Sequence, residues 1–197
     1  MLSDLLVLDL SRVLAGPYCT QLLSDLGARV IKVESFAGDD TRRWGPPFVA
    51  GESGYHLSVN RGKESVVIDL KDPRGRQVVA GLAARADVLI ENYKVGDLAR
   101  YGLDYASLAS VNPRLVYLSI TGFGQTGPRA AEPGYDAAMQ ALSGLLAMSG
   151  EPDGPPVKTP VAFIDVLTGL HGAVGVLAAL HDRAARGVGA FIDLSLF

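Results

Sequence analysis

The stretch LLVLDLSRVLAGPYCTQLLSDLGARVIKVE, residues 5–34, decides the fold. It begins with a short apolar run, Leu5–Leu10, which is typical of a β-strand. Pro17 suits the first turn of a helix, and Gly27 suits the position just past the end of that helix. The apolar run Arg29–Glu34 then predicts a second strand. A strand, a helix and a strand in this order predict a parallel sheet covered by helices.

The same alternation continues along the chain. Further strands are predicted at Ser65–Leu70, Ala86–Glu91, Leu115–Thr121 and from Ala190, and helices at about Lys71–Arg85, Tyr135–Met148 and from Phe163. Residues 35–62 show no clear periodicity, and their aromatic residues argue against disorder, so we expect a long functional loop there. The predicted fold class is therefore α/β: a Rossmann-like, mostly parallel sheet with helices on both faces.

The composition of the chain argues against several classes of binding partner and cellular location. The net charge of −3 shows no basic excess for nucleic acid or an anionic membrane. Cys19 is the only cysteine, so no internal disulfide can form, which fits a reducing, cytoplasmic location. The first residues lack a basic region before their apolar run, so no signal peptide is predicted. The most apolar run, Phe163–Leu180, carries Asp165 and His171, so no membrane span is predicted either.

The run PVAFIDVLTGLHGAVGVLAALHDR, residues 160–183, reads as one long helix from Phe163 onward. A set of large apolar residues at spacings of three and four predicts its buried face: Val166, Leu170, Val174, Leu177 and Leu180. The glycines and alanines between them leave the rest of the helix thin, so that neighbouring backbone could approach closely. Asp165 lies in the first turn, where the helix dipole would keep a carboxylate ionised. That suits a nucleophile, although a simple capping acid would explain the same position.

Several common sites leave no trace in the sequence. The turn SRVLAGPYC after the first strand lacks G-x-G-x-x-G, so a nicotinamide cofactor gains no support. No histidine or cysteine pair has metal-ligand spacing, and no G-x-S-x-G elbow is present, so neither a metal site nor a serine hydrolase is predicted. Two acids at predicted helix starts, Asp136 and Asp165, remain as candidates for chemistry. Basic residues at or near strand ends could hold a phosphorylated ligand: Arg42, Arg43, Lys71, Lys94 and Arg100.

Six segments together resemble the class III CoA-transferases, the family of formyl-CoA transferase and carnitine CoA-transferase. In chain order they are LVLDLSRVLAGPYCTQLLSDLGARVIKVE, NRGKESVVIDLKDPRG, ADVLIENYKVGDLARYGLDY, NPRLVYLSITGFGQTGP, PGYDAAMQALSG, and the Asp165 helix that ends in GVGAFIDLSLF. They cover nearly the whole chain but about the N-terminal half of a typical member. The resemblance implies that residues 1–189 form the N-terminal part of a large CoA-binding domain. Residues 190–197 would begin a strand or linker leading into a C-terminal half.

The resemblance also implies an acyl-CoA substrate, a small carboxylic acid acceptor and an interlocked homodimer. Asp165 matches the family nucleophile, which forms a mixed anhydride and then an enzyme-bound CoA thioester. Tyr135 and Asp136 match a tyrosine–acid pair beside that nucleophile. The implied CoA-binding residues are Val13, Leu14, Ala15, Ile68, Asp69, Leu70, Lys71, Asn92, Tyr93, Lys94 and Arg100. Ser35 stands where some members place an arginine, and Arg42 or Arg43 is the expected substitute.

Two alternatives stay open at this point. The same family contains racemases of 2-methylacyl-CoA esters, which resemble G-H-D where this chain has Gly134-Tyr135-Asp136. A tyrosine, with a reference pKa of about 10, is a poor acid–base substitute for that histidine, which favours the transferase. The other alternative is a truncated, non-catalytic module that binds CoA esters.

Overall fold

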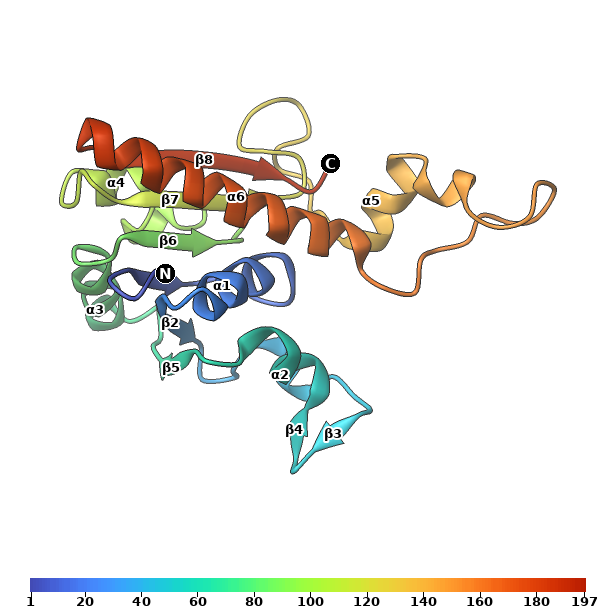
Figure 1. Cartoon of the computed structure of the whole chain (residues 1–197), viewed down its shortest axis with the longest axis horizontal. Coiled ribbons are helices and arrows are strands. Elements are labelled where there is room, and N and C mark those ends of the chain that lie inside the picture. The colour runs from blue at the N-terminus through green and yellow to red at the C-terminus, as the bar shows by residue number, and fades with distance from the viewer.

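A computed structural model describes all 197 residues and shows one central sheet with helices around it (Figure 1). The sheet strands are β1 (Leu6–Asp9), β2 (Arg29–Glu34), β5 (Glu64–Val67), β6 (Val88–Glu91), β7 (Val116–Thr121) and β8 (Ala190–Ser195). Their order is β5-β2-β1-β6-β7-β8, and every pairing is parallel. The predicted α/β class is confirmed. The last strand joins the same sheet beside β7, so residues 190–195 belong structurally with the preceding ones.

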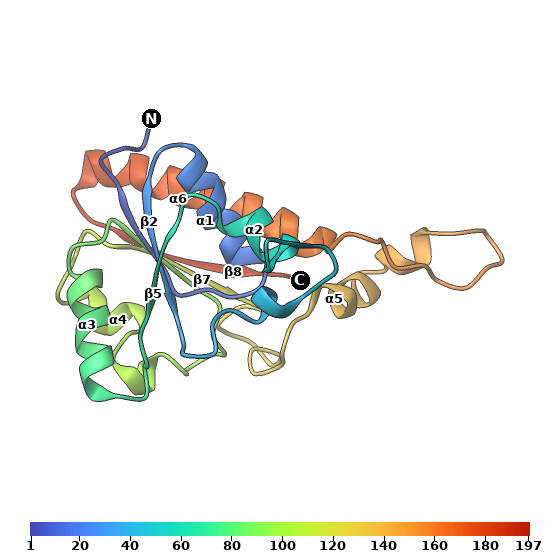
Figure 2. The ribbon, with the colours of Figure 1, turned by 90° about the horizontal axis from the view of Figure 1, so that it is seen from below.

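Helices cover both faces of the sheet (Figure 2). Helices α1 (Ala15–Asp25) and α6 (Phe163–Arg186) lie on one face, and α3 (Pro73–Ala83) and α4 (Tyr105–Ala109) lie on the other. Alternate residues of each strand pack into two separate hydrophobic cores, because successive side chains point to opposite faces of the sheet. In β7, Val116 and Leu118 enter the core under α1 and α6, whereas Tyr117 enters the core under α3 and α4.

The long helix is present as predicted, but only part of the predicted face is covered: Val166, Leu177 and Leu180 are partly buried, and Leu177 and Leu180 pack against the core. Leu170 and Val174 are 39% and 66% exposed, whereas Gly169, Gly172, Ala173 and Val176 are buried. The small residues face α1: a Cβ added at Gly169 would lie 2.7 Å from the carbonyl oxygen of Ala15. The close approach predicted from the glycines therefore decides which side is buried, because large side chains would hold the two backbones apart.

Helix α6 is the one helix whose length and composition bear on the expectation about membrane spans. By length and composition alone it could cross a membrane, because the charged residues in its most apolar stretch are too few to exclude it. In this fold one side of it packs on α1, β7 and β8.

Residues 35–62 hold more regular structure than predicted. They contain a 3-10 turn η1 (Asp40–Arg43), a small hairpin of β3 (Phe48–Val49) and β4 (Glu52–Ser53), and helix α2 (Gly54–Asn60). The helix is only two turns long, too short for its periodicity to show. It begins where the Ser53 side chain accepts a hydrogen bond from the backbone N–H of His56.

The segment between β7 and α6 projects away from the sheet (Figure 1). The predicted helix Tyr135–Met148 is split into α5 (Asp136–Leu142) and a 3-10 turn η3 (Leu145–Met148). Gly144 separates them with a φ of 82°, a left-handed conformation that glycine adopts without strain. A further 3-10 turn, η2 (Ala99–Tyr101), lies between β6 and α4.

Candidate functional site

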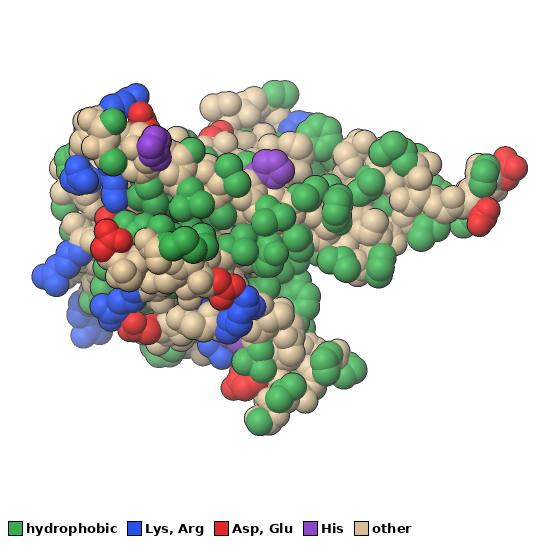
Figure 3. Space-filling model, viewed as in Figure 1, with side chains coloured by type: hydrophobic (Ala, Val, Ile, Leu, Met, Phe, Trp, Pro, Cys, Tyr) green, Lys and Arg blue, Asp and Glu red, His purple; other side chains and the backbone are tan.

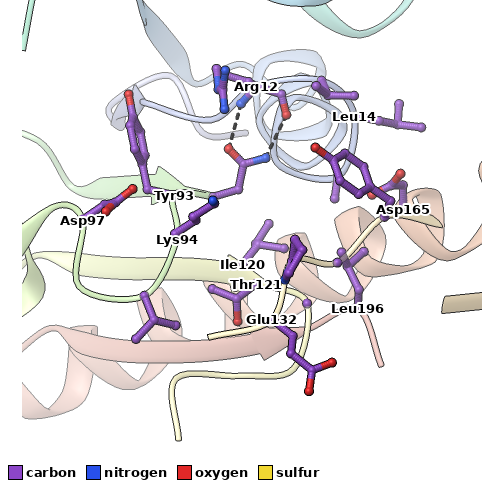
Figure 4. Close-up of a pocket in the computed structure, with 18 of the residues that line it drawn as sticks. Arg12, Leu14, Tyr93, Lys94, Asp97, Ile120, Thr121, Glu132, Asp165 and Leu196 are labelled. Atoms are coloured by element: carbon purple, nitrogen blue, oxygen red, sulfur yellow. Dashed lines mark hydrogen bonds between the residues drawn. The ribbon is translucent and has the colours of Figure 1, made fainter. Parts of the chain in front are cut away.

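A cavity of about 540 Å³ opens where the strand order of the sheet reverses. From β1 the chain builds outward through β2 and β5 on one side and through β6, β7 and β8 on the other. The loops after β1 and β6 diverge at this point, which is where ligands bind in open α/β sheets. Eight predicted site residues line the cavity (Figure 4): Val13, Leu14, Ala15, Asn92, Tyr93, Lys94, Tyr135 and Asp165.

The carboxylate of Asp165 is half-buried in the first turn of α6. Burial, together with the negative charge of Asp136, raises the pKa of Asp165 to about 7. Both effects oppose the helix dipole, which was expected to keep Asp165 ionised. Asp136 already accepts hydrogen bonds from the N–H groups at the positive end of that dipole.

Asp136 caps the start of α6 from the neighbouring helix α5. Its Oδ1 accepts hydrogen bonds from the backbone N–H groups of Ile164, at 2.7 Å, and Asp165, at 3.2 Å. The Nε2 of Gln140 donates to its other oxygen. One carboxylate thus joins α5 to the start of α6, and this contact fixes the turn that carries Asp165.

Tyr135 reaches the cavity on a loop that crosses the end of β7. Gly122 and Gly134 make that crossing possible, since a Cβ added at Gly122 would lie 2.7 Å from the Cα of Gly134. The Tyr135 side chain is 74% exposed and lines the cavity. The two members of the tyrosine–acid pair therefore differ in position: Tyr135 is exposed at the cavity, whereas Asp136 is buried.

Two aromatic residues of residues 35–62, the segment predicted to be a long loop, lie near Asp165. Trp44 lines the cavity and packs edge-on against Tyr55, with ring centroids 5.2 Å apart. Burial raises the pKa of Tyr55 to about 12, and the charge of Asp165 adds to that effect. Sequence reasoning assigned these two residues no role in the site. The signal available was the only tryptophan of the chain, placed in a long segment between two strands.

Three arginines near the cavity are each paired with an acid: Arg42 with Glu34, and both Arg12 and Arg43 with Asp40, at 3.4 Å. Arg42 is held by Glu34, with its Nη2 2.6 Å from Oε1, whereas Arg43 lines the cavity. Of the two expected substitutes for the missing arginine, only Arg43 lines the cavity. Arg12 also lines the cavity, and the sequence reasoning had not selected it.

The remaining predicted residues lie outside the cavity wall. Ile68, Asp69, Leu70 and Lys71 follow β5 at the same edge of the sheet, but none of them lines the cavity. Arg100 lies on η2 and pairs with Asp97, which does line it. The residues after β1 and β6 come together with Asp165, while those after β5 stand two strands away from β1.

A second, smaller cavity of about 400 Å³ shares Lys94 and Val95 with the first. Its wall includes Glu91, whose carboxylate accepts the backbone N–H of Tyr93 at 2.7 Å. Burial raises the pKa of Glu91 to about 7. No group of three or more histidine, cysteine, aspartate or glutamate side chains in the structure is arranged to hold a metal ion.

Comparison with known proteins identifies the family of the chain. The sequence matches the family described as CoA-transferase family III over residues 2–197. It is 52% identical to the succinate–glutarate CoA-transferase of Agrobacterium fabrum over 99% of this chain and 50% of that protein. It is 50% identical to the succinyl-CoA:glutarate CoA-transferase of Homo sapiens over 96% of this chain and 44% of that protein.

Among solved structures, a CAIB/BAIF family protein from Brucella suis superposes with a TM-score of 0.96. The two are 51% identical, and the match covers 99% of this chain and 53% of that one. The chain thus spans about half the length of the curated relatives it matches. Because the family match runs over nearly every residue, the chain belongs to CoA-transferase family III.

Proposed function

We propose that the protein containing this chain is an acyl-CoA:carboxylate CoA-transferase that works through a covalent intermediate on Asp165. The observation that carries the proposal is the position of this carboxylate: half-buried, at a helix start, in the cavity at the reversal of strand order. The family membership supplies the class of reaction. A carboxylate that forms covalent intermediates divides one difficult transfer into easier steps.

The steps balance without any further reagent. The ionised Asp165 attacks the thioester carbonyl, CoA leaves as the thiolate, and a mixed anhydride remains. The thiolate then attacks the aspartyl carbonyl, releases the first carboxylate and forms an aspartyl-CoA thioester. The acceptor carboxylate attacks this thioester and expels CoA, which finally attacks the acceptor's carbonyl and frees Asp165. An anhydride is sensitive to water, so the partial burial of Asp165 protects each intermediate.

For the substrates we propose a CoA thioester and a small dicarboxylic acid acceptor. Relatives that are about half identical to this chain are named for succinate and glutarate. Arg12, Arg43 and Lys94 line the cavity and supply positive charge for phosphate and carboxylate groups. A homodimer and a cytoplasmic location are part of the proposal as well, supported by the family resemblance and the single cysteine.

The racemase alternative is less well supported. No histidine lines the cavity, and Tyr135 occupies the position of the expected acid–base group. A non-catalytic CoA-ester-binding module would share the cavity but would form no covalent intermediate, so trapping that intermediate separates the two ideas.

The test replaces Asp165 by alanine in the full-length protein that contains this chain. With succinyl-CoA and glutarate, Asp165→Ala should lower transfer more than about a thousandfold, while free CoA still binds. Hydroxylamine should trap the acyl or CoA intermediate at Asp165 in the unmodified protein, as seen by peptide mass spectrometry. Glu132→Gln, which removes another acid lining the cavity, is the matched control and should keep its activity. Full transfer in Asp165→Ala, or trapping at Asp136, would overturn the assignment.

A further inference from the structure

The loop between β1 and α1 contains a strained residue at the wall of the cavity. Val13 has a φ of 69°, in the left-handed region. A β-branched side chain rarely adopts this conformation, because its Cβ crowds the neighbouring backbone. Such strain persists only where surrounding groups hold the backbone in place. Neighbouring groups must therefore hold the Val13 backbone in this conformation.

The first group that holds it is Asn92, at the end of β6. Its Oδ1 accepts the backbone N–H of Arg12 at 2.9 Å, and its Nδ2 donates to the carbonyl oxygen of Arg12 at 2.8 Å (Figure 4). The amide thus binds both polar groups of the residue just before Val13. This pair of hydrogen bonds also ties the loop after β1 to the loop after β6, across the point where the strand order reverses.

The second group is a buried ion pair behind the loop. The backbone N–H of Val13 donates to Oδ2 of Asp39 at 3.2 Å, and the same oxygen lies 3.0 Å from Nζ of Lys32. Lys32 also donates to the carbonyl oxygen of Ser11 at 2.8 Å. The side chains of Lys32 and Asp39 are 2% and 0% exposed. The carboxylate is held charged, because Lys32 and Thr41 lower the pKa of Asp39 against the opposing effect of burial.

Both groups are committed to the loop. Asp39 does not line the cavity, and the amide oxygen and nitrogen of Asn92 each bind Arg12. We propose that Asn92 and Asp39 are positioning residues, which hold the Arg12–Val13 backbone in its left-handed turn and act on a bound ligand through that turn. This replaces the expectation that the Asn92 side chain contacts CoA. The effect on CoA rests on the proposed function, whereas the effect on the backbone does not.

Asn92→Ala is the variant of choice for the test, because Asp39→Asn would leave the buried Lys32 without its partner. In the full-length protein, Asn92→Ala should weaken the binding of free CoA, measured by calorimetry, about tenfold. The same substitution in Val13→Gly and Val13→Asn backgrounds should cost about twofold or less, since glycine and asparagine tolerate the left-handed region. Val13→Thr, which keeps the β-branch, is the matched control and should retain the tenfold loss.

A tenfold loss in every background would mean that Asn92 contacts CoA directly and would overturn the proposal, and so would the absence of any loss. Amide hydrogen exchange without ligand gives a readout that does not depend on CoA. Asn92→Ala should speed exchange at Arg12 and Val13 while the amide of Leu118, in the core strand β7, stays slow. Unchanged exchange at Arg12 would also overturn it. If the unmodified protein fails to bind CoA, the proposed function fails, and exchange alone decides the role of Asn92.

Discussion

Two carboxylates within one hydrogen-bonded turn have separate environments and separate roles. Both oxygens of Asp136 accept hydrogen bonds, one from N–H groups of α6 and the other from Gln140. The Asp165 carboxylate instead lies at the cavity. Burial and the charge of Asp136 raise the pKa of Asp165 to about 7, so ionisation of this carboxylate is less favourable than for an exposed aspartate.

The first prediction at this scale concerns the pH dependence of transfer. In the proposed mechanism the ionised carboxylate is the nucleophile, so the rate of covalent trapping at Asp165 should rise with pH through about 7. Asp136→Asn keeps an oxygen for the N–H groups of α6 but removes the negative charge that contributes to this pKa. The midpoint should therefore fall by about one unit. Single-turnover trapping at a series of pH values measures it, and an unmoved midpoint would remove Asp136 from the explanation.

A second prediction links the same pKa to stability. The pKa of Asp165 is raised on folding, so the folded state binds the proton more tightly, and stability is lost as pH rises from about 4 through about 7. Asp165→Asn removes this penalty. After allowance for solvent screening, the variant should gain about 1–2 kcal/mol in the free energy of unfolding at pH 8. It should gain almost nothing at pH 4. Denaturant unfolding at the two pH values measures the difference, and an equal gain at both would contradict the linkage.

At the scale of the element, the contact between α1 and α6 sets the distance from the loop after β1 to Asp165. Gly169 follows Asp165 by one helical turn and lies against Ala15, which lines the cavity. The sequence predicted the existence, length and glycine-rich character of α6. It predicted the buried side only in part, because large apolar residues are the usual signal of burial, and here Leu170 and Val174 remain exposed while Gly169 and Gly172 are covered.

Two glycines of this helix give a matched pair of substitutions. A Cβ at Gly169 would meet the Ala15 carbonyl oxygen at 2.7 Å, whereas a Cβ at Gly175 would meet only Ile192, at 3.7 Å. Gly169→Ala should lower the free energy of unfolding by about 1–3 kcal/mol, because backbone must move. Gly175→Ala should instead raise it by about 0.5–1 kcal/mol, since alanine is the better helix former. Thermal unfolding of both variants provides the comparison, and effects of the same sign would contradict this packing.

At the scale of the whole molecule, strand order is what makes a site from distant residues. Val13, Asn92 and Asp165 meet because β1 and β6 are neighbours at the reversal of the sheet. The pattern of strands and helices predicted the sheet, and strand-end loops were the right places to search. That pattern carries no information about the order of the strands. The prediction that these residues lie at one site therefore came from the family resemblance. Neither source revealed the left-handed Val13, because its φ depends on side chains that lie 26 and 79 residues away.

The outer face of the molecule carries an apolar stripe along α6. Phe163, Leu170 and Val174 are 44%, 39% and 66% exposed and recur at helical spacing. Figure 3 shows apolar side chains gathered across the middle of the face on which this helix lies. Contiguous apolar surface of this kind is typical of an interaction site, since isolated monomers seldom leave it uncovered.

We therefore expect the 197-residue chain to self-associate as its concentration rises, and we expect the α6 stripe to cause it. The double substitution Leu170→Lys and Val174→Lys places two charges on the stripe without touching the buried glycine face, so association should weaken about tenfold or more while the fold persists. Val78→Lys, at an exposed valine on α3 across the sheet, is the control and should leave association unchanged. Light scattering over a concentration series measures all three proteins. A chain that stays monomeric throughout, or a control that disperses the assembly equally well, would show that this stripe does not drive association.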